Sequence, residues 1–295
     1  MLEKFSLKCC AKINLSLDVI NRREDGYHNL EMLMQAIDIS DELTVTADRS
    51  AVCGVEISCG GDIFGNECVP QNADNLAARA AALFMEETGI RCGIKIEITK
   101  HIPVGAGLGG GSSDAAGTLS AMNRLFGKPL SYSALAGIAA KIGSDVPFFL
   151  TGGCMLAEGI GTKLSPLPRL SGVTVVVAKP PFGVSTPHVY KNLRLDCDVR
   201  HPDTRGAIRA LESGSLAALA ACCGNVLETV TAAEHAEIDE YKKIMNGCGA
   251  VYSLMSGSGP TVFGIFEDEE DAAAAHKIFR EKTREVYICR PCAAL

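Results

Sequence analysis

One segment constrains this chain more than any other: five glycines fall between residues 105 and 111, where a strand-like pattern gives way to a helix-like one. An alternating apolar run ends at Thr99, and a helical pattern follows the glycines from Ser112 or Ser113 to about Leu125. Glycine keeps side chains away from a ligand, and the first N–H groups of a helix lack partners within it. The helix dipole also favours negative charge there. The segment therefore predicts a binding site for nucleotide phosphates.

Two common phosphate-binding motifs do not describe this segment. No Gly-Lys-Ser or Gly-Lys-Thr follows the glycines, so it is not a Walker A loop. Gly105, Gly107 and Gly110 satisfy the bare dinucleotide pattern, but a long strand-rich stretch precedes them and no acidic residue ends a second strand soon after. A flexible connector is the remaining alternative. Such a high glycine density between two well-formed elements favours phosphate binding instead.

The rest of the chain predicts a mixture of strands and helices. The N-terminal stretch reads as strands with a tight turn at Asp25–Gly26, and a helix is expected over 72–87, with Asp74 as its N-cap and Gly89 as its stop. The later elements follow a ferredoxin-like order, and the whole pattern predicts an α/β or α+β chain, with α+β as the expected class and domains at 1–153 and 154–295. The later expected elements are a strand over 93–99, a helix over 132–141, a strand over 173–178, a polar loop over 193–205, two or three helices to about residue 245, strands over 250–255 and 261–266, a helix over 268–282 and a strand over 286–289.

Charge and hydropathy exclude several classes of protein. The formal charge is −7, from 28 Lys and Arg against 35 Asp and Glu, so a broad nucleic-acid-binding surface is not expected. No apolar run reaches the ~18 residues of a membrane span, and the first residues lack the apolar region of a secretory signal. These features predict a cytoplasmic protein that binds neither nucleic acid nor membranes.

Thirteen cysteines are scattered through the chain. A chain of this length needs no disulfides to form a core, so most cysteines are expected to be small buried hydrophobic residues. One Cys-x-x-Cys, from Cys289 to Cys292, lacks a second pair at zinc-binding spacing. A redox or metal-binding function built on the cysteines is therefore a distant alternative.

The glycine segment resembles the central motif of the GHMP kinases, a superfamily of small-molecule kinases. That motif is Pro-x-x-x-Gly-Leu-Gly-x-x-x-Ser-x-x, and residues 103–115 match it. The blocks at 11–15 (AKINL), 25–30 (DGYHxL) and 143–149 (GSDVPFF) resemble one member, which acts on a cytidine diphosphate-linked methylerythritol in non-mevalonate isoprenoid biosynthesis. The block at 256–260 (SGSGP) resembles the third glycine motif of the superfamily. The blocks keep the family's order and span nearly the whole chain.

This resemblance implies a two-domain GHMP kinase fold, with an N-terminal ribosomal-S5-domain-2-like ATP-binding domain and a C-terminal ferredoxin-like domain. It also implies an activity, the transfer of the γ-phosphoryl group of ATP to the 2-hydroxyl of the cytidine diphosphate-linked methylerythritol, with Mg²⁺. The expected partners are these small molecules, and the expected state is a monomer or a homodimer.

The resemblance also assigns a catalytic pair by position. Asp145 matches the family's catalytic aspartate, whose carboxylate accepts the hydroxyl proton as the O–P bond forms. Lys12 matches the lysine expected beside it, a cation that keeps Asp145 ionised and attracts the acceptor hydroxyl and the phosphoryl group. The alternative for Asp145 is a helix N-cap, because Gly143 and Ser144 precede it.

Other positions match residues that bind the two substrates. Asp114 stands where other members can carry Asn, and its role stays open between holding Mg²⁺ and capping the helix. Lys100 could contact adenine or be a solvated strand end, and Tyr27 could be a structural tyrosine. The expected ATP-binding residues are Pro103, Gly105, Gly107, Leu108, Gly109, Gly110, Gly111, Ser112, Ser113, Asn75 and Lys100, with Mg²⁺ near Ser112 or Ser113. The expected substrate-binding residues are Asn14, Tyr27, His28, Thr186 and Tyr190, with His28 at the cytosine edge and aromatic rings on the base.

Two rival functions remain at this point. Another GHMP kinase would act on homoserine, mevalonate or a sugar, but the block around His28 argues against it. A nucleotide-binding regulator without catalysis would have no chemical reason to keep both Lys12 and Asp145. Replacing Gly109 by valine is expected to weaken nucleotide binding and to leave the fold intact.

Overall fold

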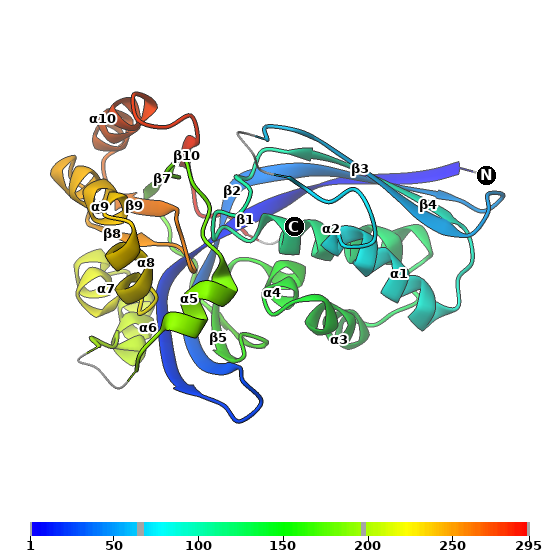
Figure 1. Cartoon of the computed structure of the whole chain (residues 1–295), viewed down its shortest axis with the longest axis horizontal. Helices are drawn as coiled ribbons and strands as arrows, with labels where there is room; N and C mark the ends of the chain where they lie inside the picture. The colour runs from blue at the N-terminus through cyan, green and yellow to red at the C-terminus, as the bar shows by residue number, and fades with distance from the viewer. Residues whose placement is uncertain (1, 64–67, 196–198, 294–295) are drawn as a thin grey trace.

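The computed structural model describes residues 2–63, 68–195 and 199–293. Residues 196–198 of the predicted polar loop, Cys197 among them, lie outside the described residues. The chain forms two lobes, each with its own sheet and its own helices (Figure 1). The N-terminus lies at the far end of the first lobe, whereas Pro291, near the C-terminus, pairs with Ile37 of the first lobe.

A long antiparallel hairpin forms the centre of the first lobe. Its strands β1 (Leu2–Arg22) and β2 (His28–Asp48) flank the predicted turn, where Gly26 has a φ of +87°. The sheet order is β3-β4-β2-β5-β6, with β1 paired to β2 and with β3 and β4 parallel. The other strands are β3 (Gly54–Gly61), β4 (Gly93–Lys100), β5 (Cys154–Gly159) and β6 (Lys163–Leu167).

Helices pack against one side of this sheet (Figure 1). The alternation predicted for β4 places Ile94, Ile96 and Ile98 in the buried core, where they join helical residues such as Phe84 and Leu119. The hydrophobic effect therefore joins strand and helix through the residues whose period the sequence shows. The helices are α1 (Leu76–Thr88), α2 (Gly110–Leu125), α3 (Tyr132–Ile142) and α4 (Val146–Thr151).

Two predicted helix starts were wrong by a few residues. The N-cap of α1 is Asn75, whose side-chain oxygen accepts the Ala77 N–H at 2.9 Å, and not Asp74. Asp74 lies in the preceding turn, where its own N–H donates to Asn72. Helix α2 starts at Gly110 rather than at the serines, because Gly109 adopts the left-handed conformation and ends the loop there. The stop of α1 at Gly89, with a φ of +69°, is as predicted.

The second lobe contains a four-stranded antiparallel sheet of order β10-β7-β9-β8, the arrangement expected for a ferredoxin-like domain. The α+β prediction is therefore confirmed. Four helices lie between residues 204 and 247 instead of two or three, and the first of them begins inside the predicted polar loop. The strands are β7 (Thr174–Ala178), β8 (Tyr252–Met255), β9 (Val262–Phe266) and β10 (Val286–Cys289). The helices are α5 (Thr186–Asn192), α6 (Thr204–Ser213), α7 (Leu216–Cys222), α8 (Glu228–Glu234), α9 (Glu237–Gly247) and α10 (Glu269–Arg280).

The boundary between the two sheets lies beyond residue 153. Strands β5 and β6 belong to the first sheet, because β5 continues the antiparallel pairing along β2, and the second sheet begins only with β7. We therefore propose that the two domains divide between residues 167 and 174 rather than at residue 153.

The cysteines of the described ranges are all free thiols. Four of them, Cys9, Cys92, Cys154 and Cys289, are buried, and Cys53 and Cys68 are exposed. The expectation of mostly buried cysteines was therefore wrong, since the others are only partly covered. Among the described residues, no group of three or more His, Cys, Asp and Glu side chains is arranged to hold a metal ion. No helix of the described chain is long and apolar enough to cross a membrane.

Candidate active site

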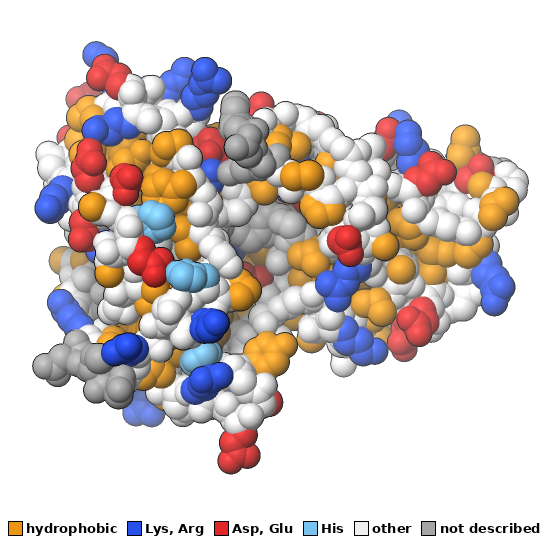
Figure 2. Space-filling model, viewed as in Figure 1, with side chains coloured by type: hydrophobic (Ala, Val, Ile, Leu, Met, Phe, Trp, Pro, Cys, Tyr) orange, Lys and Arg blue, Asp and Glu red, His pale blue; other side chains and the backbone are white. Residues whose placement is uncertain are grey.

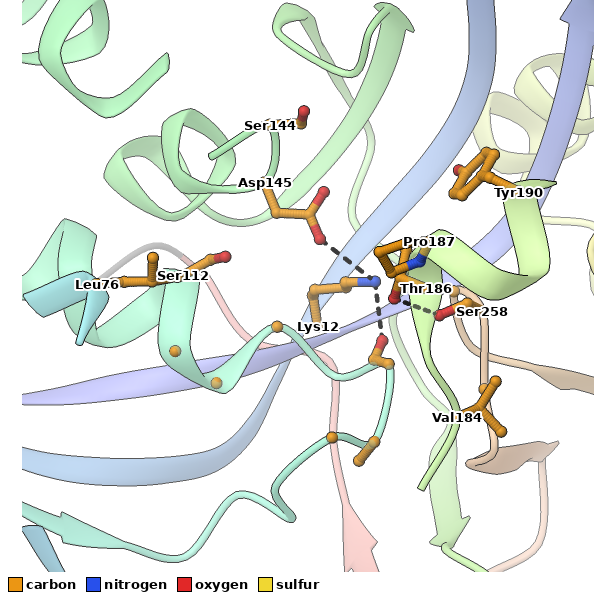
Figure 3. A pocket seen from close by; sticks show the side chains of 18 of the residues that line it. Lys12, Leu76, Ser112, Ser144, Asp145, Val184, Thr186, Pro187, Tyr190 and Ser258 are labelled. Carbon is orange, nitrogen blue, oxygen red and sulfur yellow. Dashed lines mark hydrogen bonds and ion pairs between the residues drawn. The ribbon is translucent and has the colours of Figure 1, made fainter. Parts of the chain in front are cut away.

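A cavity of about 1010 Å³ lies where the two lobes meet, a size suited to small-molecule ligands. Its walls come from β1, β2, the glycine loop, the start of α4, α5 and the turn between β8 and β9. Figure 2 shows the surface hollowed between the two lobes, with acidic and basic side chains scattered over both. Figure 3 shows Lys12, Asp145, Ser112 and Tyr190 around this cavity.

The glycine loop forms one wall of the cavity, as its sequence predicts. Gly105, Gly107 and Gly109 all have φ between +60° and +74°, a backbone conformation that L side chains rarely adopt. The first residues of α2 also line the cavity, so the positive end of the helix dipole faces it. An anion in the cavity would meet backbone N–H groups that have no partner within the helix.

At two of these glycines the surrounding protein leaves no room for a side chain. A Cβ on Gly107 would lie 2.2 Å from the Ser256 carbonyl oxygen, and a Cβ on Gly109 would lie 2.7 Å from the Phe149 ring. A valine at Gly109 would therefore disturb the packing of α4, so we now expect this substitution to destabilise the fold as well as to weaken nucleotide binding. Gly105 differs, because a Cβ there meets no protein atom within 4 Å.

Gly105→Ala should raise the KM for ATP at least several-fold, because its methyl group would project beside the expected path of the phosphates. Left-handed backbone costs a non-glycine residue roughly 1–2 kcal/mol, so stability should also fall. Gly127→Ala is the matched control: Gly127 has a φ of +76°, has equally open surroundings and does not line the cavity. Steady-state kinetics and thermal unfolding of both variants test this. Equal ATP KM values would mean that Gly105 does not face the nucleotide.

Lys12 on β1 and Asp145 at the start of α4 lie side by side at the wall of the cavity (Figure 3). The Lys12 ammonium donates to Asn14 Oδ1 at 2.6 Å and to the Gly107 carbonyl oxygen at 2.9 Å, and it lies 3.8 Å from Asp145 Oδ2. Burial lowers the pKa of Lys12, and Asp145 opposes this shift. The ammonium is thus fixed by two oxygens of the first lobe beside a carboxylate that stays accessible from the cavity.

The side chain of Asp145 does not cap a helix. Asp145 occupies the N-cap position of α4, but its carboxylate makes no capping hydrogen bond, and the residue has αR backbone angles. Its side chain is one-third exposed and points toward Lys12 (Figure 3). The geometry therefore favours a chemical role for this carboxylate over the helix-cap alternative.

Lys100 is a buried charge and not a solvated strand end. Its ammonium forms ion pairs with Asp41 and, at 2.8 Å, with Asp114, and all three side chains are almost fully buried. Burial alone would lower the pKa of Lys100, but the two carboxylates outweigh it and raise the pKa. Asp41 also accepts the backbone N–H groups of His101 and Ile102, so this cluster anchors the chain that enters the glycine loop.

Asp114 is not a helix cap, because it lies one turn inside α2. Burial raises its pKa to about 7, although Lys100 opposes the shift. Its Oδ1 atom is buried and has no hydrogen-bond partner among the described residues. Asp114 lines the cavity together with Lys100 and Asn75, so these three polar residues stand at the same wall.

Two expected ATP-binding residues do not line the cavity. Ser113 is buried and its hydroxyl donates to the Cys10 carbonyl oxygen at 2.7 Å. Leu108 is buried in the core, and its carbonyl oxygen accepts the Lys12 N–H. Ser112 does line the cavity, so it is the serine of this pair that can reach a phosphate or a metal ion. Pro103, Gly110, Gly111 and Asn75 line it as well.

Three of the expected acceptor-binding residues form an aromatic group at the cavity wall: the rings of His28 and Tyr190 lie 5.2 Å apart, and exposed Tyr27 precedes His28. The other two lie elsewhere on the wall, where Asn14 contacts Lys12 and the Thr186 hydroxyl lies 2.7 Å from that of Ser258. Burial, followed by the nearby Arg22, lowers the pKa of His28, so its imidazole is neutral at neutral pH and can both donate and accept hydrogen bonds. Burial raises the pKa of Tyr190, and the charge of Asp145 adds to the shift.

Several cavity residues were not foreseen from the sequence. Arg22 pairs with His28 across the end of the hairpin, and Lys191 follows Tyr190, so both cations stand at the acceptor end. The Asp25–Gly26 turn could have indicated Arg22, because a hairpin places residues on either side of its turn opposite each other. Gly257, Ser258 and Gly259 of the third glycine motif also line the cavity.

The fold and this cavity define a small-molecule kinase of the GHMP class. The family model "GHMP kinases N terminal domain" matches residues 75–153, and "GHMP kinases C terminal" matches residues 207–284. The chain is 43% identical over 287 residues to a 4-diphosphocytidyl-2-C-methyl-D-erythritol kinase of Acetivibrio thermocellus, covering 97% of this chain and 99% of the relative. It is 45% identical to the kinase of the same name from Clostridium novyi, covering 95% and 97%.

A solved structure agrees with these relatives. The crystal structure of a 4-(cytidine 5'-diphospho)-2C-methyl-D-erythritol kinase matches with a TM-score of 0.80 and 35% identity, covering 97% of this chain and 98% of that chain. The chain therefore belongs to the GHMP kinases and, within them, to the family of 4-diphosphocytidyl-2-C-methyl-D-erythritol kinases.

Proposed function

We propose that this protein transfers the γ-phosphoryl group of ATP to the 2-hydroxyl of 4-diphosphocytidyl-2-C-methyl-D-erythritol, a step of non-mevalonate isoprenoid biosynthesis. The observation that carries the proposal is the meeting of three parts in one cavity. These are the glycine loop at the start of α2, the pair Lys12 and Asp145, and the aromatic end around His28. Membership of the family supports the same activity.

In this proposal Asp145 is the general base. Phosphoryl transfer requires positioning and charge neutralisation more than covalent chemistry. The acceptor hydroxyl loses its proton to the Asp145 carboxylate as its oxygen bonds to the γ-phosphorus, the bond from that phosphorus to the bridging oxygen breaks, and ADP leaves. Lys12, held by Asn14 and Gly107, stabilises the charge that develops on the phosphoryl group. Asn14 is thus a positioning residue for Lys12, and it lines the cavity as well.

ATP and Mg²⁺ would be held at the glycine-loop end. The residues fit the phosphates, because a helix N-terminus and an open Gly105 face the cavity there. Mg²⁺ takes few protein oxygens and keeps phosphate and water ligands, and the accessible Ser112 hydroxyl fits that requirement. Mg²⁺ would supply charge neutralisation for the phosphates when bound. The wall formed by Asn75, Lys100 and Asp114 would lie near the adenine ring of ATP. The charge of Lys100 is already paired with two carboxylates.

The direct test is ATP turnover with and without the cytidylated methylerythritol. ADP production that depends on this acceptor, together with a phosphorylated product by mass spectrometry, is the expected result. Homoserine, mevalonate and simple sugars form the comparison panel, because they are the acceptors of the rival GHMP kinases. Nucleotide binding without turnover on any acceptor would instead indicate a regulator that has lost catalysis.

His28→Ala should raise the KM for the cytidylated acceptor by one to two decades and leave the KM for ATP nearly unchanged. A buried base that loses a polar partner is penalised by ~1–3 kcal/mol, which corresponds to that range. His276→Ala, on α10 and away from the cavity, is the control. Equal changes in both KM values would argue against a role for His28 in reading cytosine.

A further inference from the structure

The turn at residues 256–260, between β8 and β9, closes over the glycine loop. Ser256 Oγ donates to the Gly107 carbonyl oxygen at 3.0 Å, and the same oxygen accepts from the Lys12 ammonium. A Cβ on Gly257 would lie 3.4 Å from Lys12 Nζ and 3.2 Å from the Gly107 carbonyl oxygen. The turn therefore belongs to the second lobe in sequence but forms part of the surroundings of the Lys12 ammonium.

Asn225 binds the backbone of this turn without lining the cavity. It lies between α7 and α8 and is buried. Its Nδ2 atom donates to the carbonyl oxygens of Met255 at 2.7 Å and Gly257 at 2.8 Å, and its Oδ1 atom accepts the Leu227 N–H at 3.0 Å. One nitrogen atom thus donates both N–H bonds of the amide, one to the last carbonyl group of β8 and one to Gly257 in the turn.

The chain around Asn225 is itself attached to the first lobe. The Leu17 N–H donates to the Gly224 carbonyl oxygen at 2.8 Å, and the Val226 N–H donates to the Leu17 carbonyl oxygen at 3.0 Å. Leu17 lies on β1, five residues beyond Lys12. Asn225 therefore connects the strand that carries Lys12 with the turn that faces the Lys12 ammonium, through backbone contacts on one side and its own amide on the other.

We propose that Asn225 is a positioning residue for phosphoryl transfer, whose amide holds Gly257 against Gly107 and Lys12. The Lys12 ammonium then keeps its place between the glycine loop and Asp145. This inference rests on the proposed function, because it concerns the same transfer step. Without the amide, the Met255 and Gly257 carbonyls lose their donor, and the turn is free to move away from the ammonium.

Asn225→Asp tests this with almost no change in size. The carboxylate cannot donate and would face two carbonyl oxygens. We expect kcat to fall roughly 10- to 100-fold, the cost of a small misplacement at a reacting centre. The acceptor KM should change less than kcat, since the only hydrogen bond of the turn with an expected acceptor-binding side chain among the described residues is the 2.7 Å one between the Ser258 and Thr186 hydroxyls. Unfolding alone would also lower the apparent kcat at an unchanged KM, so kcat is expressed per folded molecule, with the folded fraction taken from thermal unfolding.

Asn123→Asp is the matched control. Asn123 is also a buried amide outside the cavity wall, but it donates to the Leu130 carbonyl oxygen at 3.1 Å and accepts the Leu130 N–H at 3.0 Å rather than holding the turn at residues 256–260. It should lose stability and retain kcat per folded molecule, with the folded fraction taken from thermal unfolding. Equal losses of kcat per folded molecule in the two variants would overturn the proposal.

If Asn225→Asp does not fold, Thr231→Val replaces it. The buried Thr231 hydroxyl donates to the Ser258 carbonyl oxygen at 3.1 Å, so it holds the same turn from α8 without lining the cavity. Valine keeps its shape, and we expect a several-fold loss of kcat per folded molecule. An unchanged kcat would count decisively against the proposal. A wild-type protein that phosphorylates nothing would contradict the proposed function instead, before any variant is compared.

Discussion

Asp145→Asn should lower kcat by about 10²–10⁴-fold, the range typical of a lost general base, with ATP affinity nearly unchanged. Asparagine keeps the size of the side chain but cannot take the proton of the acceptor hydroxyl. ATP affinity should persist because the phosphates depend on the glycine loop and the start of α2. Rapid-quench measurements of the transfer step and equilibrium binding of ATP separate the two effects.

The same substitution also distinguishes the base from a helix cap. Asparagine caps helices about as well as aspartate, so a residue that only caps α4 would tolerate it. Asp203→Asn is the matched control, since Asp203 is the N-cap of α6 and accepts the Gly206 N–H at 2.8 Å. It should retain both stability and turnover. Near-normal turnover in Asp145→Asn would mean that the base lies elsewhere.

Lys12→Met should lower kcat by at least 10²-fold, because the variant loses the only positive charge that contacts Asp145 among the described residues. A preorganised charge at the site of developing negative charge is worth several kcal/mol, about two to three decades in rate. Burial lowers the pKa of Lys12. When the ammonium loses its proton at high pH, the site loses the same positive charge that Lys12→Met removes, so the rate should fall. The rate should therefore fall on the alkaline side below the pH at which an ordinary lysine titrates.

A matched control and a double variant complete this test. Lys179→Met removes another buried lysine, one that pairs with Glu285 in the second lobe and does not line the cavity. It should destabilise the protein without lowering kcat per folded molecule. The Lys12→Met, Asp145→Asn double variant should lose less than the product of the two single losses, because residues that act as a unit are not additive. Fully multiplicative losses would show that the two act independently.

The sequence alone determined the parts of this protein that depend on local patterns. The glycine loop and helix α2, the Asp25–Gly26 turn and the ferredoxin-like order of the last elements could all be predicted. They follow from glycine content, periodicity and turn residues over a few neighbouring positions. The resemblance to the GHMP kinases then indicated Lys12 and Asp145, which no local rule could have paired.

Only the tertiary structure decided which residues share an environment. Strands β5 and β6 join the first sheet because β2 is long enough to pair with both β4 and β5, which moves the division between the sheets beyond residue 153. Lys100 meets Asp41 and Asp114 from three different elements, so a residue that looked like a strand end is a buried charge.

The same holds for the interior of the site. Ser112 and Ser113 are adjacent, but the helical turn points one into the cavity and buries the other against Cys10. Asn225 reaches Gly257 within the second lobe, and Gly257 lies beside Lys12 only because the two lobes meet there. Local propensity acts over a few residues, whereas burial and hydrogen bonding select partners from anywhere in the chain. The sequence therefore predicted the glycine loop, the Asp25–Gly26 turn and the order of the last elements, and tertiary packing decided which side chains line the cavity.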